Sequence, residues 1–203
     1  MIHLEKMAHE IGRRLLIEHE VKNYQIYGSI ATKTYDQYSD IDLEIDVSGT
    51  DNSLFIQKIP TILAKDYPII FTDYAPSLAP NEYLISIAMF EEYPFLILDV
   101  KCTATPHYQT LSKNDLRVQM DPYQHILKIF IANLKHYLRG QECMKDILKM
   151  YQKAFNLAPP SLNEKQLLML TFNWLYNNST THYKAYLQNL SNYIETEMYF
   201  TIL

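Results

Sequence analysis

The stretch YGSIATKTYDQYSDIDLEIDV, from Tyr27 to Val47, joins a Gly-Ser pair to a row of acidic residues. Its last four acids alternate with apolar residues and are Asp40, Asp42, Glu44 and Asp46. Alternation with a period of two is typical of a β-strand with one buried face, so the four carboxylates share the other face. Such neighbouring charges repel one another, and partly buried ones are costly unless something compensates them.

A divalent cation is one compensator. Mg²⁺ binds one or two carboxylates together with phosphate oxygens and water, and an Asp-x-Asp pair on a strand supplies such carboxylates. A solvated face whose acids have no function is the alternative, and the alternation alone leaves both open. The Gly28-Ser29 pair in front of the acids favours the first, because a small residue at a strand–helix turn lets backbone N–H groups and a hydroxyl approach phosphate oxygens.

The segment YGSIATKTYDQYSDIDL resembles the signature of the DNA polymerase β-like nucleotidyltransferase superfamily. It is most similar to the small bacterial branch that contains aminoglycoside nucleotidyltransferases and the minimal nucleotidyltransferases. The family pattern is a strand, Gly-Ser, a short helix, Asp-x-Asp on the next strand and a third carboxylate on a later strand. The resemblance is strong over residues 24–47 and moderate over residues 94–101.

The resemblance implies a role for each matching residue. Gly28 and Ser29 would hold the triphosphate, and Asp40 and Asp42 would bind Mg²⁺. The segment FLILDVK offers Asp99 as the third carboxylate, and an ordinary strand-end acid paired with Lys101 is the alternative for this residue.

The sequence departs from the family pattern at two places. Many relatives carry a basic residue and then Gly after Gly-Ser-x-Ala, whereas this chain has Thr32 and Lys33 there. Lys33 supplies a positive charge one residue later, and we take it as a candidate phosphate contact. Glu44 and Asp46 extend the acidic row where relatives have apolar residues. These two acids either lie beyond the covered part of the sheet or shape a pocket for a cation.

The chemistry implied is a transfer of a nucleoside monophosphate, AMP from ATP or the equivalent from another nucleoside triphosphate, to a hydroxyl group. Two Mg²⁺ ions about 3.5–4 Å apart would be held by Asp40, Asp42 and Asp99. A separate carboxylate can serve as general base. Asp99 is the first candidate for that role, and three glutamates near the later strands are weaker ones: Glu82, Glu91 and Glu92.

Hydrophobic periodicity predicts an α+β fold, which the resemblance makes a nucleotidyltransferase-fold mixed β-sheet flanked by helices, followed by a C-terminal helical bundle. We expect a catalytic domain at 1–118 and a helical domain at 119–203. The expected elements of the first are a helix within 3–20, a helix at 51–65 that Pro60 bends or breaks, and strands at YQIYG, SDIDLEIDV, YPIIFTDY, EYLISIAM and PFLILDVKC. Helices then follow from 121 to Arg139-Gly140, over 144–155, after the capping-box spacing of Ser161 to Glu164, and over 181–199.

Composition narrows the setting. The 48% hydrophobic content suits a packed core, and no apolar run approaches the length of about 20 residues that spans a bilayer, so no membrane partner is expected. The start lacks the apolar region of a signal peptide, and the two cysteines show no pairing pattern, which favours a reduced cytoplasmic protein. The net charge of −5 and the absence of a visible basic stripe disfavour nucleic acid as a partner.

Three functions remain open. The first is a Mg²⁺-dependent transferase that modifies a small hydroxylated acceptor such as an aminoglycoside. Such a modification would give antibiotic resistance. The second is an antitoxin-like transferase that adenylylates a partner protein, although such relatives are usually shorter. The third is a non-catalytic nucleotide-binding module. The helical half either forms one wall of the acceptor cleft, or stabilises the first half or makes a homodimer.

Overall fold

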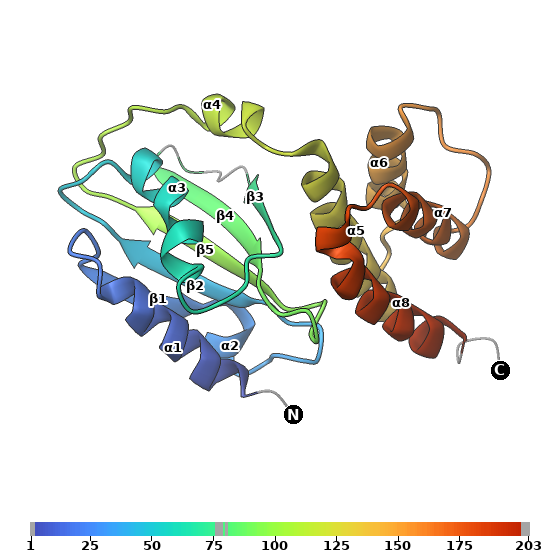
Figure 1. Cartoon of the computed structure of the whole chain (residues 1–203), viewed down its shortest axis with the longest axis horizontal. Helices are drawn as coiled ribbons and strands as arrows, with labels where there is room; N and C mark the ends of the chain where they lie inside the picture. The colour runs from blue at the N-terminus through green and yellow to red at the C-terminus, as the bar shows by residue number, and fades with distance from the viewer. Residues whose placement is uncertain (1–2, 76–78, 80, 200–203) are drawn as a thin grey trace. The chain divides into compact units, whose positions relative to one another are not determined.

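The computed structural model of the 203-residue chain describes residues 3–75, 79 and 81–199 (Figure 1). The chain divides into two compact units, one of Met1–Phe90 with Leu96–Met120 and one of Glu91–Phe95 with Asp121–Leu203. The sequence-based division at 118/119 assigns the short segment Glu91–Phe95 to the first domain. In the structure this segment interrupts the first unit and belongs to the second. In the described part of the chain, no helix combines the length and apolar character needed to cross a bilayer.

The first unit is built on a five-stranded sheet with the order β1-β2-β5-β4-β3. Its strands are β1 (Asn23–Tyr27), β2 (Ile41–Asp46), β3 (Phe71–Ala75), β4 (Glu82–Ala88) and β5 (Ile97–Thr103). Strands β2 and β5 are parallel, and all other neighbours are antiparallel. The predicted α+β architecture with a mixed sheet is therefore confirmed.

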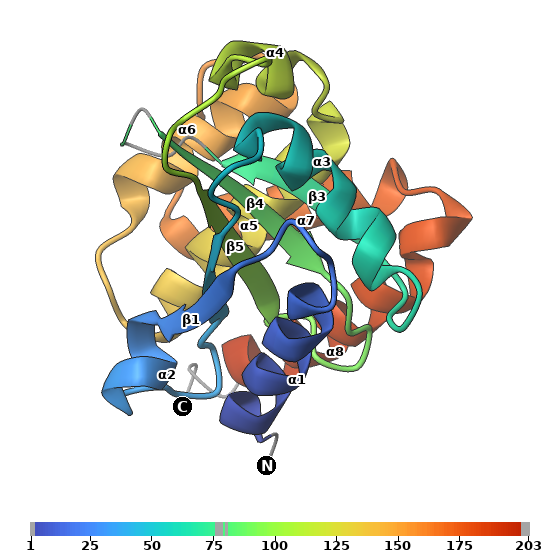
Figure 2. The ribbon, with the colours of Figure 1, turned by 90° about the vertical axis from the view of Figure 1, so that its left-hand side faces the viewer.

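Two helices cover one face of this sheet, α1 (Leu4–Leu16) and α3 (Asn52–Leu63) (Figures 1 and 2). The side chains of β2 alternate between buried apolar residues and half-buried acids, and the apolar set, with Leu43 at its centre, joins the core under the two helices. Because side chains of a strand alternate between faces, all the acids of β2 lie on the face away from α1 and α3. We call this the acidic face.

Pro60, which the sequence predicts to bend or break this helix, lies inside α3 and does not break it. The helix begins at Asp51, whose side chain accepts hydrogen bonds from the backbone N–H groups of Ser53 and Leu54, and it continues through Pro60 to Leu63. Proline removes one intrahelical hydrogen bond. The turn beyond it persists because Ile62 and Leu63 are buried in the core.

Two short helices complete the first unit. Helix α2 (Gly28–Thr32) follows β1 directly, as the resemblance implies. Helix α4 (Lys113–Val118) was not anticipated from sequence, although Ser112 and Asp115 form a capping box at its start.

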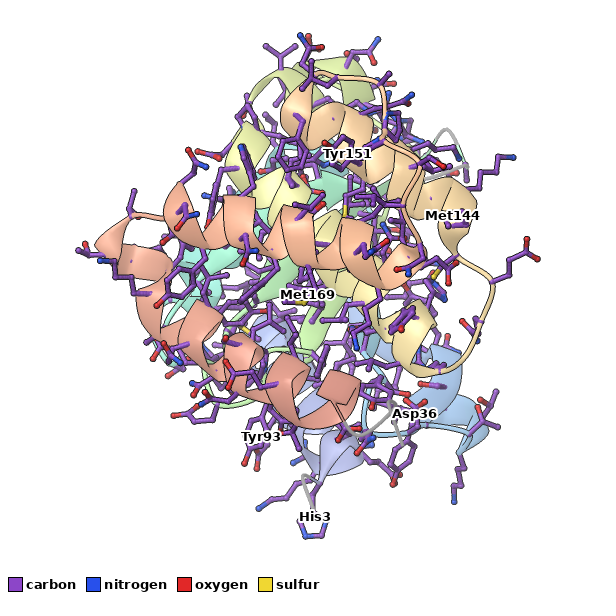
Figure 3. The ribbon with its side chains drawn as sticks, turned by 90° about the vertical axis from the view of Figure 1, so that its right-hand side faces the viewer. His3, Asp36, Tyr93, Met144, Tyr151 and Met169 are labelled. Carbon is purple, nitrogen blue, oxygen red and sulfur yellow. The ribbon has the colours of Figure 1, made fainter. Side chains whose placement is uncertain are left out.

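The second unit is helical, with α5 (Pro122–Leu138), α6 (Met144–Phe155), α7 (Glu164–Asn177), a 3₁₀ turn at Thr181–Tyr183 and α8 (Lys184–Tyr199). Figure 3 shows this unit from the side of α7 and α8, with Tyr151 marking α6 and Met169 marking α7. Rings of α5 and α7 meet in its core, where Phe130 and Phe172 have centroids 5.8 Å apart. The capping box of α7 is formed by Asn163 and Gln166, two residues later than the predicted Ser161–Glu164 pair, because the Asn163 side chain accepts from the Gln166 N–H.

The segment Glu91–Phe95 joins β4 to β5 and packs against α8. The hydroxyl of Tyr186 donates to the carbonyl of Pro94, and Asn189 Nδ2 donates to the carbonyl of Glu91 at 2.9 Å. Phe95 meets Tyr193 edge to face with ring centroids 5.4 Å apart. These three contacts explain why the segment groups with the helical unit.

Candidate active site

A single row of side chains crosses the acidic face from one edge of the sheet to the other. The pairing register places Asp42 of β2 directly beside Asp99 of β5, although 57 residues separate them in the sequence. The same register sets Tyr27 beside Asp42 on one side and Ser86 beside Asp99 on the other, and the row ends at Asp73 on β3. Because register partners project to the same side, the two acids implied by the resemblance lie on neighbouring strands of one face.

The carboxylate of Asp42 lies against the backbone of the Gly-Ser turn. Gly28 has a φ of +67°, a conformation in which a side chain is strained, and a Cβ added there would stand 2.0 Å from Asp42 Oδ2. Glycine is therefore required at this position both by the backbone conformation and by the space that the carboxylate occupies. Ser29, half-buried, follows within α2. The structure thus brings Gly28 and Asp42 together.

Asp40 lies on the same face, one residue before β2 begins. Its Oδ1 accepts a hydrogen bond from the backbone N–H of Ile97 at 3.2 Å, so the side chain reaches across to the start of β5. The bond ties Asp40 to the strand that carries Asp99. All three predicted acids are therefore connected to β5. Asp99 lies on this strand, Asp42 is its register neighbour, and Asp40 is hydrogen-bonded to its first residue.

Asp99 is held by a hydroxyl. Ser86 Oγ donates to Asp99 Oδ1 at 2.5 Å, and the Ser86 side chain is fully buried. An O–H···O⁻ bond of this length is characteristic of a charge-assisted interaction, which is stronger than a hydrogen bond between neutral groups.

The other two acids of the row, Glu44 and Asp46, have partners outside the Asp42–Asp99 pair, so a strand with four acids does not need a cation for each of them. Lys101 Nζ lies 2.6 Å from Glu44 and 3.8 Å from Glu82, and it also stands 5.1 Å above the ring of Tyr27. Asp46 Oδ1 accepts from the Ser48 N–H at 2.8 Å and so closes a turn after β2. Glu44 and Asp46 are thus partnered by Lys101 and by a turn, two and four residues along β2 from Asp42.

Tyr27 adds an aromatic ring to this face. Burial raises the pKa of its hydroxyl above the ordinary value, and the negative charges of Asp42 and Asp99 raise it further. The phenol therefore stays protonated at neutral pH and offers a hydrogen-bond donor beside the carboxylate pair.

Lys33 lies exposed at the end of α2 in the left-handed conformation, with φ 57° and ψ 32°. Glycine adopts this conformation without strain, so a lysine here carries a backbone cost. Its backbone N–H donates to the carbonyl of Ile30 at 3.2 Å and so caps α2. The structure places its ammonium group at the surface beyond the Gly-Ser turn.

The weaker candidates for a general base do not join the row. Glu82 pairs with Lys101, and its register partner is Thr103, four residues along β5 from Asp99. Glu91 and Glu92 belong to the segment that packs on α8 in the second unit. Asp99 is the only one of the four acids considered for this role that is a register neighbour of Asp42.

Within the described residues, no set of three or more His, Cys, Asp or Glu side chains is arranged to hold a metal ion. Mg²⁺ bound with a nucleotide does not require such a set, because one or two carboxylates suffice when phosphate oxygens and water complete its shell. The Asp42–Asp99 pair meets this smaller requirement, since two carboxylates that repel each other stand side by side on one face.

Sequence reasoning missed Ser86, and it considered Lys101 only as a partner of Asp99. Ser86 is polar at the centre of the strand segment EYLISIAM, and Lys101 follows Asp99 by two residues on the same face. Alternation along β5 was sufficient to place Lys101 beside the acids. A serine among branched apolar residues was the signal for Ser86.

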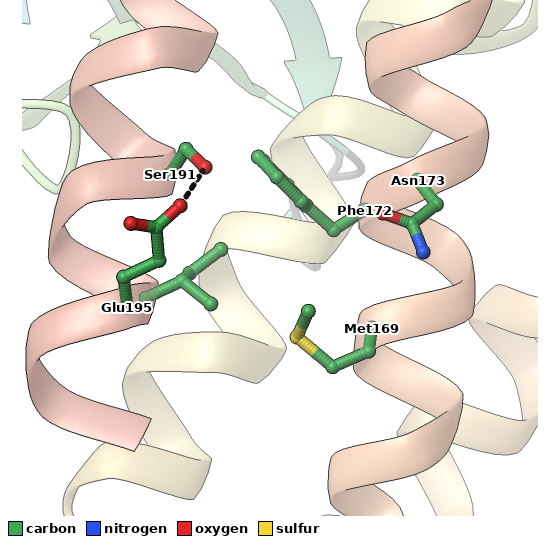
Figure 4. A pocket seen from close by; sticks show the side chains of 6 residues that line it. Met169, Phe172, Asn173, Ser191 and Glu195 are labelled. Carbon is green, nitrogen blue, oxygen red and sulfur yellow. Dashed lines mark hydrogen bonds between the residues drawn. The ribbon is translucent and has the colours of Figure 1, made fainter. Parts of the chain in front are cut away.

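The helical unit contains a separate hollow of about 470 Å³ between α7 and α8 (Figure 4). Its lining combines apolar and polar side chains: Met169, Phe172, Asn173, Ser191, Ile194 and Glu195. Ser191 donates to Glu195 at 3.2 Å across one turn of α8. The hollow contains none of the acids predicted from sequence.

Comparison of this chain with known proteins finds similar solved structures at low sequence identity and low TM-score. No protein-family model matches the chain, and no curated protein matches it. Among solved structures, the chain is similar to the polymerase core of TRAMP, an RNA surveillance complex, at 12% identity and a TM-score of 0.41, over 87% of this chain and 58% of that one. It is also similar to a chain of the GLD-2/RNP-8 complex at 9% identity and a TM-score of 0.39, over 87% of this chain and 79% of the other.

These likenesses are too distant to carry a functional argument. The chain spans little more than half the length of the TRAMP polymerase core, 58%. What bears on function is therefore the chain's own geometry, in which the strand, the Gly-Ser turn, the short helix and the two facing acids follow in the order of the family pattern.

Proposed function

We propose that this chain is a Mg²⁺-dependent nucleotidyltransferase that moves a nucleoside monophosphate, AMP from ATP, to a hydroxyl group of a small molecule. The observation that carries the proposal is the register of Asp42 with Asp99 on parallel neighbouring strands, with the Asp42 carboxylate against the backbone of Gly28. Charge repulsion makes this pair costly in isolation, and a bound cation offsets that cost.

The roles follow from the chemistry of the groups. Asp42 and Asp99 would hold Mg²⁺ together with Asp40, and the metal would supply charge stabilisation at the phosphates and at the attacking oxygen. The N–H groups and hydroxyl of Gly28-Ser29 would contact triphosphate oxygens, and Lys33 would add a positive charge beyond them. Positioning and electrostatics contribute most of the acceleration in phosphoryl transfer, because little covalent chemistry is left to the protein.

Asp99 is our candidate for the group that accepts the proton of the attacking hydroxyl. It lies beside Asp42 in the register of the sheet, and a hydrogen bond from Ser86 orients it. Lys101 supports this face indirectly, because its ammonium group pairs with the carboxylates of Glu44 and Glu82.

For the acceptor we propose a small hydroxylated molecule of the aminoglycoside type, as the resemblance implies. The acidic balance of the chain, with a net charge of −5, is compatible with a cationic acceptor. Transfer to a partner protein and nucleotide binding without transfer are the alternatives that an acceptor screen separates.

The first experiment is a calorimetric titration with a non-hydrolysable ATP analogue, with and without Mg²⁺. Asp42→Asn is the test variant, and Asp46→Asn on the same face of the same strand is the matched control, because Asp46 serves the turn at Ser48. We expect Mg²⁺-dependent binding that Asp42→Asn abolishes and Asp46→Asn retains.

Silence of the wild-type chain toward analogues of ATP, GTP, CTP and UTP would overturn the proposal. Equal losses in the two variants would also count against it, because they would indicate a general effect of removing negative charge from this face. Binding that passes these tests leads to a screen in which labelled AMP is followed onto hydroxylated amines, onto protein and onto water.

A further inference from the structure

We propose that Ser86 is a positioning residue for the metal-binding carboxylate Asp99, an inference that rests on the proposed function. Ser86 lies on β4 as the register partner of Asp99, and Asp99 lies in turn beside Asp42. The carboxylate of Asp99 therefore stands between a hydroxyl donor on one strand and a second carboxylate on the other.

The placement of Ser86 indicates a role beyond filling space. Its side chain is fully buried in the middle of a strand whose neighbouring residues, Ile85 and Ile87, are branched and apolar. A buried hydroxyl costs free energy unless it is hydrogen-bonded, and an alanine or valine there would avoid that cost. The hydroxyl of Ser86 instead donates to Asp99 Oδ1 at 2.5 Å.

The bond acts on Asp99 in two ways. It places a hydrogen-bond donor against one oxygen of Asp99, which offsets part of the repulsion from the neighbouring carboxylate of Asp42. It also fixes the torsion of the side chain, because one oxygen is held toward β4 and the rotation of the carboxyl group is restricted. Donors that orient metal-binding carboxylates in this manner affect metal affinity nearly as strongly as some ligands do.

The chain supplies a matched control for this inference. Ser53 is also fully buried, and its hydroxyl also donates at 2.5 Å to an aspartate, Asp51, at the start of α3. Ser53→Ala therefore removes an equally buried hydroxyl from a carboxylate that has no proposed contact with metal, and it also removes the acceptor of the Leu111 N–H at 3.0 Å. Comparison of the two variants separates a general loss of stability from a specific loss at the acidic face.

The experiment is a Mn²⁺ titration of the full chain, followed by electron paramagnetic resonance of the free ion, in the presence of a saturating non-hydrolysable ATP analogue. We expect Ser86→Ala to weaken the apparent Mn²⁺ affinity by about 10- to 100-fold, the range found when such supporting donors are removed. Ser53→Ala should leave the Mn²⁺ affinity within about twofold of wild type, because only its stability is affected.

Ser86→Cys provides the decisive measurement if Ser86→Ala fails to fold. Cysteine has nearly the same shape, but its S–H group is a weak donor, so a weakened Mn²⁺ affinity is again expected. Mn²⁺ affinities of the Ser86 variants equal to that of Ser53→Ala would overturn the positioning role while leaving the proposed function intact. Absence of nucleotide-dependent Mn²⁺ binding in the wild-type chain would overturn both, so the two failures are distinguishable.

Discussion

At the scale of single residues, Gly28 determines both the backbone conformation of the turn and the space available to the Asp42 carboxylate. Gly28→Ala would introduce the strain of a left-handed residue, about 1–2 kcal/mol, and would also place a methyl group 2.0 Å from Asp42 Oδ2. We expect this variant to lose Mg²⁺-dependent nucleotide binding, because the Asp42 carboxylate must move. Calorimetry with the ATP analogue measures the loss.

Gly140→Ala is the control for the backbone strain alone. Gly140 has a φ of +68°, nearly the same as that of Gly28, but an added Cβ would meet nothing within 4 Å. Both variants should lose a similar amount of stability from strain, and only Gly28→Ala should lose binding. Normal nucleotide binding by Gly28→Ala would mean that the Asp42 carboxylate is not required in its present position.

Substitution of Lys33 should change stability and nucleotide binding in opposite directions. Lys33→Gly relieves the positive φ of 57° and should raise the free energy of unfolding by up to about 1 kcal/mol, because glycine adopts this conformation without strain. The same variant should weaken nucleotide binding, since it removes the positive charge beyond the Gly-Ser turn. Urea unfolding and calorimetry on one preparation measure both quantities.

Lys33→Arg is the matched control, because it keeps the charge and the strained backbone. It should bind nucleotide like the wild-type chain and show no gain in stability. A Lys33→Gly variant that is more stable and binds with unchanged affinity would remove Lys33 from the phosphate site and leave it as a helix-capping residue only.

At the scale of elements, the contact of α1 with β1 depends on a glycine inside the helix. An added Cβ at Gly12 would stand 2.4 Å from the ring of Tyr24, so the helix can approach the strand only because that Cβ is absent. Gly12→Ala should destabilise the protein by about 1–3 kcal/mol through overpacking, even though alanine favours a helix by about 1 kcal/mol. The midpoint of urea unfolding measures the balance.

The sign of this effect should reverse in a second background. In Tyr24→Ala the ring is gone, so adding Gly12→Ala should now stabilise the protein by up to about 1 kcal/mol through helix propensity alone. A destabilising effect of the same size in both backgrounds would show that the contact between Gly12 and Tyr24 does not set the distance between α1 and β1.

The sequence is sufficient to place most elements, because their signals are local. The alternation of Ile41 to Asp46 predicts β2 and its two faces, and helical spacing predicts α1 and the helices after residue 121. The sequence predicts a helix over 51–65 but leaves open whether Pro60 breaks it, because the last turn depends on burial in a core assembled from distant strands.

The candidate site is predicted by sequence only in part. The resemblance identifies Asp42 and Asp99, but their register depends on which strands become neighbours, and that is decided by burial of one face of the whole sheet. Alternation places Lys101 on the face of the acids, but its pairing with Glu44 could not be predicted, because the two residues meet across parallel strands that are far apart in the chain.

At the scale of the whole molecule, the division into units is discontinuous along the chain. Glu91–Phe95 belongs to the helical unit, while Ala88 before it and Ile97 after it are paired in the sheet. A cut at 118/119, as the sequence suggests, would therefore leave this segment without α8. The backbone N–H of Ile97 holds Asp40, so the segment ends two residues before a group that the proposed site uses.

The contacts with α8 should control the opening of this segment. Tyr186→Phe removes the hydroxyl that donates to the Pro94 carbonyl, and loss of a partner for a buried group costs about 1–3 kcal/mol. We expect faster amide hydrogen exchange in residues 91–95, measured by mass spectrometry, with exchange in β5 unchanged because its ladder is paired on both sides. Tyr176→Phe is the control, since Tyr176 is exposed and its hydroxyl donates to the Gln188 side chain at 3.3 Å. Equal exchange in residues 91–95 of both variants would show that Tyr186 does not hold the segment against α8. Faster exchange in β5 would show that the segment and the strand open as one cooperative unit.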